Sequence, residues 1–127
     1  MKQCFLSRKG PKAVGPYSTA TVSGGFAFVS GMLPCDPATG KIAEGGIAAQ
    51  ARQVLENVRT VLEEMGIGLA DVLKATVFLT DLGNFSEVNA VYAEYFGPDY
   101  PARSCFEVSK LPMGAQIEIE VIASAIQ

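Results

Sequence analysis

The chain has 127 residues, with no histidine and no tryptophan, and carries a formal net charge of −3. The missing histidine excludes a Ser-His-Asp or Cys-His nucleophile, a histidine-ligated zinc or iron site and a histidine pH switch, because each of these needs an imidazole. The ten basic residues are scattered and outnumbered by thirteen acidic ones, which argues against a surface that follows a nucleic-acid backbone.

The first third of the chain is predicted to hold short strands and turns. After a short strand-like run at the start, residues 8–16 carry two glycines and two prolines and are expected to form a loop. Residues 20–31 read as two strands joined at Gly24 and Gly25, which is a hairpin signal. A second turn-rich loop is expected over 34–41.

Residues 47–65 show the clearest periodicity in the sequence. Apolar side chains recur there at spacings of three and four, which predicts one face of a helix. That face consists of Ile47, Ala51, Val54, Leu55, Val58, Val61, Leu62 and Met65. Gly66 is placed to end the helix as a left-handed cap.

The second half of the chain adds three strands and one helix. Residues 72–80 are largely apolar and rich in β-branched side chains, as expected of a buried strand. A helix is expected over about 84–96, stopped by a Gly-Pro pair. Its inner face would carry Phe85, Val88, Tyr92 and Tyr95. Two further strands follow over 102–109 and 116–126, joined by the segment KLPMGA.

This order predicts a two-layer α+β domain over residues 1–127, with both helices on one face of a single sheet, because strand–helix–strand crossovers are right-handed. A chain of this size buries roughly two thirds of its surface on folding. The other sheet face is then either polar or covered by another chain. The low charged fraction of 18% is compatible with an oligomer and with an apolar-rich monomer alike.

Three cysteines, Cys4, Cys35 and Cys105, form no CxxC pair, and their spacings fit no metal site. No apolar run has the length of a membrane span, and none is placed as in a signal peptide. We therefore expect a reduced, cytosolic, soluble protein.

The last two strands carry the most informative polar residues. Side chains alternate along a strand, so Arg103, Cys105 and Glu107 share one face while Ser104, Phe106 and Val108 share the other. In the next strand, Glu118 and Glu120 point to one face, and the isoleucine and valine side chains point to the other. If the apolar sets lie under the helices and the strands pair as a hairpin, Arg103 comes close to Glu118 or Glu120.

Two interpretations of that arrangement stay open. One is a solvated face with a weak Arg–Glu pair. The other is a site, in which the Arg103 fork grips a carboxylate and a glutamate orients water. Cys105 has no base beside it and is weak as a nucleophile, although its backbone amide could bind ligand oxygens. Tyr17 is either core or site, and Gly31 after Ser30 either lets a ligand approach the backbone or forms a bulge.

Seven segments, in order along nearly the whole chain, resemble the RidA/YjgF family. They are GPYS at 15–18, SGMLPCDPATG at 30–40, NVRTVLEEMG at 57–66, KATVFLTDL at 74–82, VNAVYAEYF at 88–96, PARSCFEV at 101–108, and LP with IEIEVIA at 111–123. The resemblance implies a chorismate-mutase-like α+β fold with a mixed sheet of about six strands. It also implies a homotrimer packed through the sheets, with sites between subunits.

The activity implied by the resemblance is hydrolysis of reactive enamines and imines, such as 2-aminoacrylate, to a 2-ketoacid and ammonia without metal or cofactor. Residue by residue, Arg103 would grip the substrate carboxylate, and Glu118 would hold the attacking water. The Cys105 amide would bind substrate, and Tyr17, Ser30 and Gly31 would line the pocket.

Two positions depart from the family pattern: Met32 and Thr19 stand where glutamine is usual. Two other functions are weighed beside the deaminase. One is a non-catalytic module that binds small acids such as 2-ketoacids. The other is an RNA-cleaving translation inhibitor, a label some family members carry, which the absence of histidine and of a basic stripe disfavours.

Overall fold

The hairpin predicted at Gly24 and Gly25 is present in the computed structural model, which describes residues 1–126 of the protein. Strand β2 (Ala20–Ser23) pairs antiparallel with β3 (Phe26–Met32) across these two residues. Their φ values of 61° and 81° are the left-handed conformation that a two-residue hairpin turn requires, and glycine adopts it freely. The short strand β1 (Gln3–Phe5) extends this hairpin on its outer side.

Both predicted helices form where the apolar periodicity places them. Helix α1 (Gly46–Glu64) buries seven of the eight side chains of its predicted face, and the eighth, Met65, is partly buried just beyond its end. Gly66 has a φ of 75°, as expected of a left-handed cap. Helix α2 (Phe85–Phe96) buries Val88 and Tyr92 of its predicted inner face, whereas Phe85 is 40% exposed and Tyr95 is partly buried.

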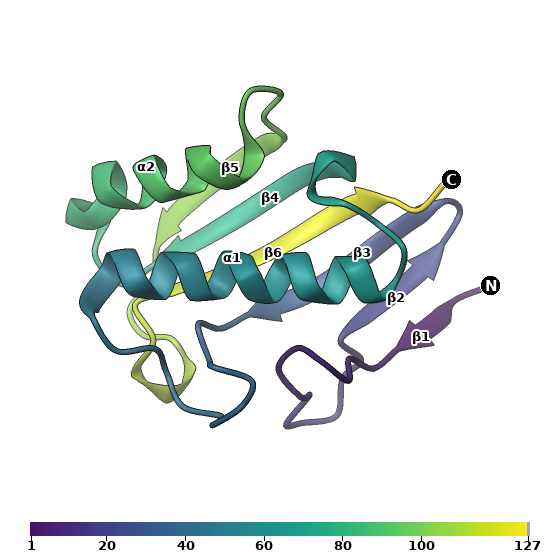
Figure 1. The fold of residues 1–127 in the computed structure, drawn as a ribbon, viewed down its shortest axis with the longest axis horizontal. Coiled ribbons are helices and arrows are strands. Elements are labelled where there is room, and N and C mark those ends of the chain that lie inside the picture. The colour runs from purple at the N-terminus through teal and green to yellow at the C-terminus, as the bar shows by residue number, and fades with distance from the viewer. Residues whose placement is uncertain (127) are drawn as a thin grey trace.

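The sheet is mixed and has six strands in the order β1-β2-β3-β6-β4-β5. Strand β6 (Ile117–Ser124) lies antiparallel between β3 and β4 (Val72–Leu79), and β5 (Ala102–Glu107) lies parallel to β4 at the far edge (Figure 1). The α+β fold with one sheet of about six strands is therefore confirmed. Within the described residues there are also three 3₁₀ turns, at Leu69–Asp71, Leu82–Asn84 and Pro112–Gly114.

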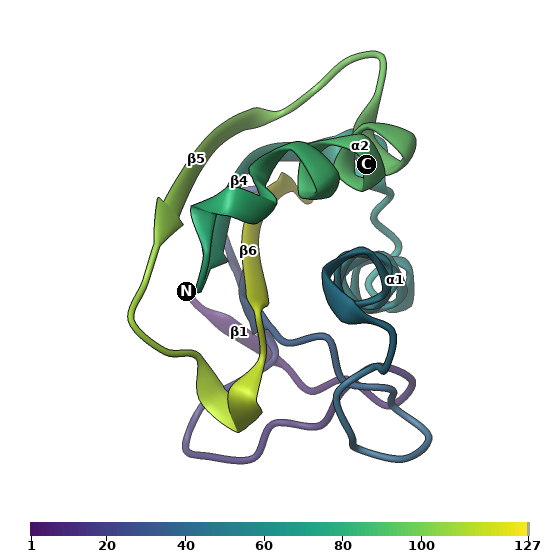
Figure 2. The ribbon, with the colours of Figure 1, turned by 90° about the vertical axis from the view of Figure 1, so that its left-hand side faces the viewer.

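Both helices cover the same face of the sheet, as the crossover rule predicts (Figure 2). The core between the layers contains the alternate side chains of β4 and β6, among them Val77, Leu79, Ile117 and Ile119, none of which is exposed. Within residues 1–126, neither helix combines the length and the apolar character needed to cross a membrane.

The predicted geometry of the last two strands is wrong in two respects. Strands β5 and β6 do not pair as a hairpin, because β4 lies between them. The alternation in β5 also has the opposite phase: Arg103 pairs with Ala75 of β4, which is fully buried under the helices, whereas Phe106 is 54% exposed on the open face. At this edge the uncovered face of the sheet is apolar rather than polar. The assumption that apolar side chains lie under the helices therefore assigned the side chains of β5 to the wrong faces.

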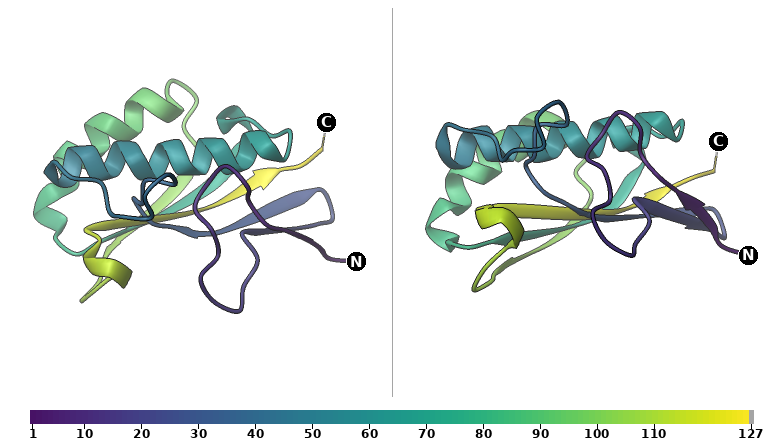
Figure 3. Two further views of the ribbon diagram at one scale, coloured as in Figure 1. Left: turned by 60° about the horizontal axis from the view of Figure 1, so that its bottom comes forward. Right: turned by 90° about the horizontal axis from the view of Figure 1, so that it is seen from below.

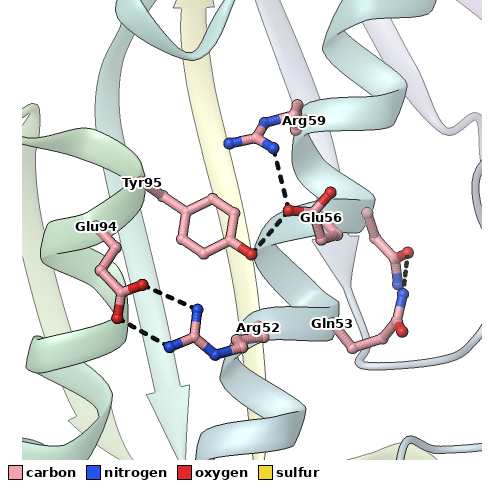
Figure 4. Close-up of polar contacts among 7 residues, drawn as sticks. Arg52, Gln53, Glu56, Arg59, Glu94 and Tyr95 are labelled. Atoms are coloured by element: carbon pink, nitrogen blue, oxygen red, sulfur yellow. Dashed lines mark hydrogen bonds and ion pairs between the residues drawn. The ribbon is translucent and has the colours of Figure 1, made fainter.

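A cluster of polar contacts holds α2 against α1 on the outer side of the helical layer (Figure 4). Arg52 makes a two-pronged ion pair with Glu94, with N–O distances of 3.0 and 2.9 Å. Glu56 accepts hydrogen bonds from the Tyr95 hydroxyl at 2.8 Å and from Arg59 at 3.1 Å. Such exposed pairs contribute little stability each, about 0–1 kcal/mol. These contacts join α2, which carries part of the site below, to α1.

Candidate functional site

Arg103 belongs to the edge strand β5, and its side chain contacts helix α2. Its Nη1 donates a hydrogen bond to Oδ1 of Asn89 at 2.8 Å. The guanidinium carbon lies 4.8 Å from the centre of the Tyr92 ring and 5.4 Å from that of Phe85. Among residues 1–126 the only salt bridges are Arg52–Glu94 and Arg59–Glu56, so Arg103 has no carboxylate partner there. An arginine that one amide oxygen and two aromatic rings hold in place still has donors that can bind an anionic ligand.

Asn89 is a residue that the sequence interpretation missed. Phe85, Asn89 and Tyr92 follow the spacing i, i+4 and i+7, so they lie on one face of α2. An amide in the middle of an otherwise apolar helix face needs a hydrogen-bond partner when the helix packs. That spacing is the signal that could have linked Asn89 to a polar group on the sheet.

A hollow of about 400 Å³ opens beside this arginine, lined in part by Asn89, Tyr92, Tyr100 and Arg103. The Tyr92 hydroxyl is buried and has no hydrogen-bond partner within the described part of the chain. Burial raises the pKa of this hydroxyl, and the nearby Arg103 charge lowers it by less. The hollow therefore presents a cation and an amide beside a buried phenol, which suits a small polar anion.

Cys105 is half-buried and packs against the hydrophobic core. Burial raises the pKa of its thiol, and the opposing effect of Arg103 is smaller. A thiol that stays protonated is a poor nucleophile. This favours the prediction that any role of Cys105 in binding comes from its backbone.

Glu118 lies on the open face of the sheet, where it pairs across the ladder with Phe78 of β4. Burial raises the pKa of its carboxyl group, and the neighbouring charge of Glu120 raises it further. Gly31 lies directly against this carboxylate, so that a Cβ atom at Gly31 would overlap the Glu118 oxygen. The ladder between β3 and β6 shifts register between Val29 and Met32, so Gly31 lies in a bulge and also permits a close approach.

Ser30 and Tyr17 lie next to this carboxylate region. The Ser30 hydroxyl donates to the carbonyl of Ser18 at 2.7 Å, and the Ser30 amide donates to that of Thr19 at 2.9 Å. These bonds hold the segment before β2 against the end of β3. The Tyr17 side chain is 48% exposed and lines two hollows, one shared with Ser30 and the other with Gly31.

The two departures from the family pattern, Thr19 and Met32, both line the hollow that Tyr17 and Gly31 share. Thr19 is 2% exposed, and its hydroxyl also accepts a hydrogen bond from the Ser7 amide at 3.0 Å, which ties the N-terminal loop to the start of β2.

The structure thus places the predicted residues in two clusters. Tyr17, Ser30, Gly31 and Glu118 lie together, while Arg103 and Cys105 lie with Asn89 under α2. The predicted closeness of Arg103 and Glu118 within one chain is wrong, because they face opposite sides of the sheet. Their α-carbons are about 14 Å apart, since two strand spacings of about 4.8 Å and three residues of about 3.3 Å separate them. Within residues 1–126, no three Cys, Asp or Glu side chains gather as a metal site.

Comparison with known proteins agrees with the fold and the chain length. The family model described as endoribonuclease L-PSP matches residues 7–125. A RutC family protein of Pyrococcus horikoshii is 50% identical over 123 residues, which cover 97% of this chain and 98% of that protein. A Bos taurus protein named 2-iminobutanoate/2-iminopropanoate deaminase is 42% identical over 123 residues, which cover 97% of this chain and 90% of that protein.

The solved structure of the YjgF gene product from E. coli has the same fold. It matches this protein with a TM-score of 0.92 and 39% identity, covering 98% of this chain and 99% of the other. Because the family model and these similarities extend over nearly the whole chain, this protein belongs to the RidA/YjgF family, whose model is described as endoribonuclease L-PSP.

Proposed function

We propose that this protein is a hydrolytic deaminase of 2-imino acids, such as 2-iminopropanoate, the imine tautomer of 2-aminoacrylate. The observation that carries the proposal is the environment of Arg103, whose guanidinium is held by Asn89 and two rings and has no carboxylate partner within residues 1–126. Such a fork fits a substrate carboxylate. A Bos taurus relative named for this activity supports the choice of substrate.

The proposed reaction adds water across the C=N bond. Arg103 fixes the substrate carboxylate, and Glu118 accepts a hydrogen bond from the attacking water. The water oxygen forms a bond to the imine carbon, and its two protons pass to the nitrogen. The C–N bond then breaks, so one imine and one water give one 2-ketoacid and one ammonia. The reaction requires neither metal nor cofactor.

A second copy of the chain would complete the site. Arg103 belongs to the edge strand β5, whose outer side has no strand partner within the described chain, and Glu118 lies on the uncovered sheet face. Exposed aromatic residues on that face, Phe26, Phe28 and Phe106, give it the apolar character of an interface. We infer that the sheets of three copies pack together, and that each site takes Arg103 from one copy and Glu118 from another.

An arginine and a glutamate are sufficient for this site, because imine hydrolysis has a low barrier. Imines hydrolyse in water unaided, so a useful acceleration is small: a factor of about 10³ requires about 4 kcal/mol of barrier lowering. Positioning of the substrate by one arginine fork and of the water by one carboxylate can supply that amount. The absence of histidine therefore does not count against this activity.

The experiment generates 2-aminoacrylate with a serine dehydratase and follows the rate of pyruvate release with and without this protein. We expect acceleration by the wild type and none by Arg103→Ala. Retention of the full rate by Arg103→Ala would show that the role of Arg103 is wrong.

Two other results would replace the proposal with another function. Tight 2-ketoacid binding without any change in imine lifetime would identify a binding module. Cleavage of RNA by a pure preparation, lost in Arg103→Ala, would identify the nuclease named in the family description.

A further inference from the structure

A hollow of about 410 Å³ lies beside Gly31 at one end of the sheet. The loops before β2 and after β3 and the turn at Pro112–Gly114 gather at this end of the molecule (Figure 3). Most of the lining is apolar, and we call the part formed by Val14, Tyr17, Met32, Leu33, Cys35 and Met113 the methionine chamber. Lys12 and Asp36 also line the hollow, and both retain exposure to solvent.

The sulfur atoms give the methionine chamber an adaptable apolar wall. The Cys35 sulfur lies 3.9 Å from the Met113 sulfur. Met32 is 5% exposed and belongs to the core side of the chamber, whereas Met113 is 57% exposed. Methionine side chains are unbranched and polarisable, so they adjust to apolar groups of different shape.

Side-chain hydrogen bonds hold the loops that form the wall of the chamber. Asn57 of α1 is 1% exposed, and its side-chain nitrogen donates to the carbonyls of Leu33 at 2.9 Å and Cys35 at 2.8 Å. On the opposite side, Glu64 accepts a hydrogen bond from the Ser7 hydroxyl and another from the Arg8 amide, which anchors the start of the loop that leads to Tyr17. A chamber held in this way is formed before a ligand arrives.

The chamber adjoins the proposed reaction centre through Gly31. This glycine lines the chamber, and its missing Cβ leaves the space that the Glu118 carboxylate occupies. Tyr17 lines both the chamber and the neighbouring hollow at Ser30. A substrate whose imine carbon lies near a water on Glu118 therefore has the chamber within reach of its side chain.

We propose that the methionine chamber binds the substrate side chain, and that the protein prefers 2-imino acids with long apolar or thioether side chains. This inference rests on the proposed deaminase function. Each methylene that becomes buried favours binding about fourfold, so kcat/KM is expected to rise along the series of imines derived from alanine, norvaline and norleucine. The imine derived from methionine, with its thioether, belongs at the upper end.

The test uses an amino acid oxidase to produce each imine from its amino acid, with semicarbazide as a competing trap. The loss of semicarbazone with added protein gives kcat/KM for each member of the series. We expect at least a tenfold rise from the alanine-derived to the norleucine-derived imine in the wild type. A flat series in the wild type would overturn the inference.

Two variants and one control locate the effect. Met32→Gln keeps the length of the side chain and adds an amide. Met113→Asn introduces a polar residue that tolerates the φ of 61° observed at this position. Both are expected to flatten the series. Met65→Gln, the same change at a methionine outside the chamber, is expected to leave the series unchanged. An unchanged slope in both chamber variants would contradict the assignment.

A binding measurement separates this inference from the function on which it rests. Calorimetry with pyruvate and with 2-ketohexanoate compares the two side chains without any turnover. If no imine is accelerated but 2-ketohexanoate binds at least tenfold more tightly, the deaminase proposal fails and the chamber assignment holds. If imines are accelerated and the two ketoacids bind equally, the chamber assignment fails and the deaminase proposal stands.

Discussion

The side chains of Arg103 and Glu118 lie on opposite faces of the same sheet. Arg103 pairs across the β4–β5 ladder with the buried Ala75 and contacts Asn89 of α2, whereas Glu118 pairs with Phe78 on the uncovered face. No rotation of either side chain brings both groups to one small substrate within a single copy. A reaction that uses both residues therefore needs two copies of the chain.

Replacement of Arg103 by lysine tests the need for a fork. Arg103→Lys retains the positive charge but loses the paired donors, so it cannot reproduce a two-pronged grip on a carboxylate. Hydrogen bonds to charged groups contribute about 1.5–3 kcal/mol, and we expect kcat/KM to fall by about 10- to 100-fold. Kinetics on the alanine-derived imine would measure this, and activity equal to that of the wild type would show that charge alone suffices.

Replacement of Asn89 by aspartate tests its role in positioning the guanidinium. The new carboxylate would lie at the position of the amide oxygen, 2.8 Å from Nη1, and would compete with the substrate carboxylate for Arg103. We expect a higher KM and weaker 2-ketoacid binding, with a smaller change in kcat. Asn89→Ala should cost less than Asn89→Asp. Equal effects of the two changes on KM would contradict a positioning role.

The raised pKa of Glu118 predicts the pH dependence of activity. The carboxylate form is the one that can orient water, so kcat/KM should fall as the pH is lowered through this pKa, at a higher pH than for an ordinary glutamate. Glu120→Gln removes the neighbouring charge and should move this acidic fall in kcat/KM to lower pH. If the acidic fall in kcat/KM does not move, then either it does not report the titration of Glu118 or Glu120 does not raise the pKa of Glu118.

The raised pKa of Glu118 also predicts how the stability of the protein depends on pH. Because the pKa of Glu118 is raised in the folded protein, its stabilising contribution is present below the unfolded-state pKa and is lost as the pH rises through the folded-state pKa. Glu118→Gln should therefore melt at a higher temperature than the wild type at pH 7, and this difference should vanish in acid. Thermal unfolding at several pH values checks both statements, and a lower Tm for the variant at pH 7 would contradict them.

Gly31 offers a test of the space around the carboxylate. A methyl group there would overlap the Glu118 oxygen, so Gly31→Ala should displace the carboxylate and lower kcat/KM by at least tenfold. Such overpacking costs about 1–3 kcal/mol of stability. Gly68→Ala is the matched control, because a Cβ there meets its nearest atom at 3.7 Å, an ordinary contact. Full activity of Gly31→Ala would show that the carboxylate position is not critical.

Local patterns predicted much of the fold. The Gly24–Gly25 hairpin and both helices depend on neighbours in sequence, and the structure confirms them. The insertion of β6 between β3 and β4 could not be read in the same way, because it is a pairing between segments far apart in the chain.

The site was only partly predictable for a related reason. Phe106 was expected under the helices because it is apolar, but it lies on the exposed face of an edge strand. Arg103 takes the inner position instead, because α2 supplies the Asn89 amide and two aromatic rings. The partners of this partly buried charge come from another element, so strand alternation alone cannot choose between the two faces.

Mixing two inactive variants tests the shared site most directly. Arg103→Ala and Glu118→Ala are each expected to lack activity, and equal amounts are unfolded together and refolded so that the copies mix. If each site takes its arginine and its glutamate from different copies, about one site in four is intact and about a quarter of the wild-type rate returns. A mixture no more active than the separate variants would contradict a site that is shared between copies and uses both residues.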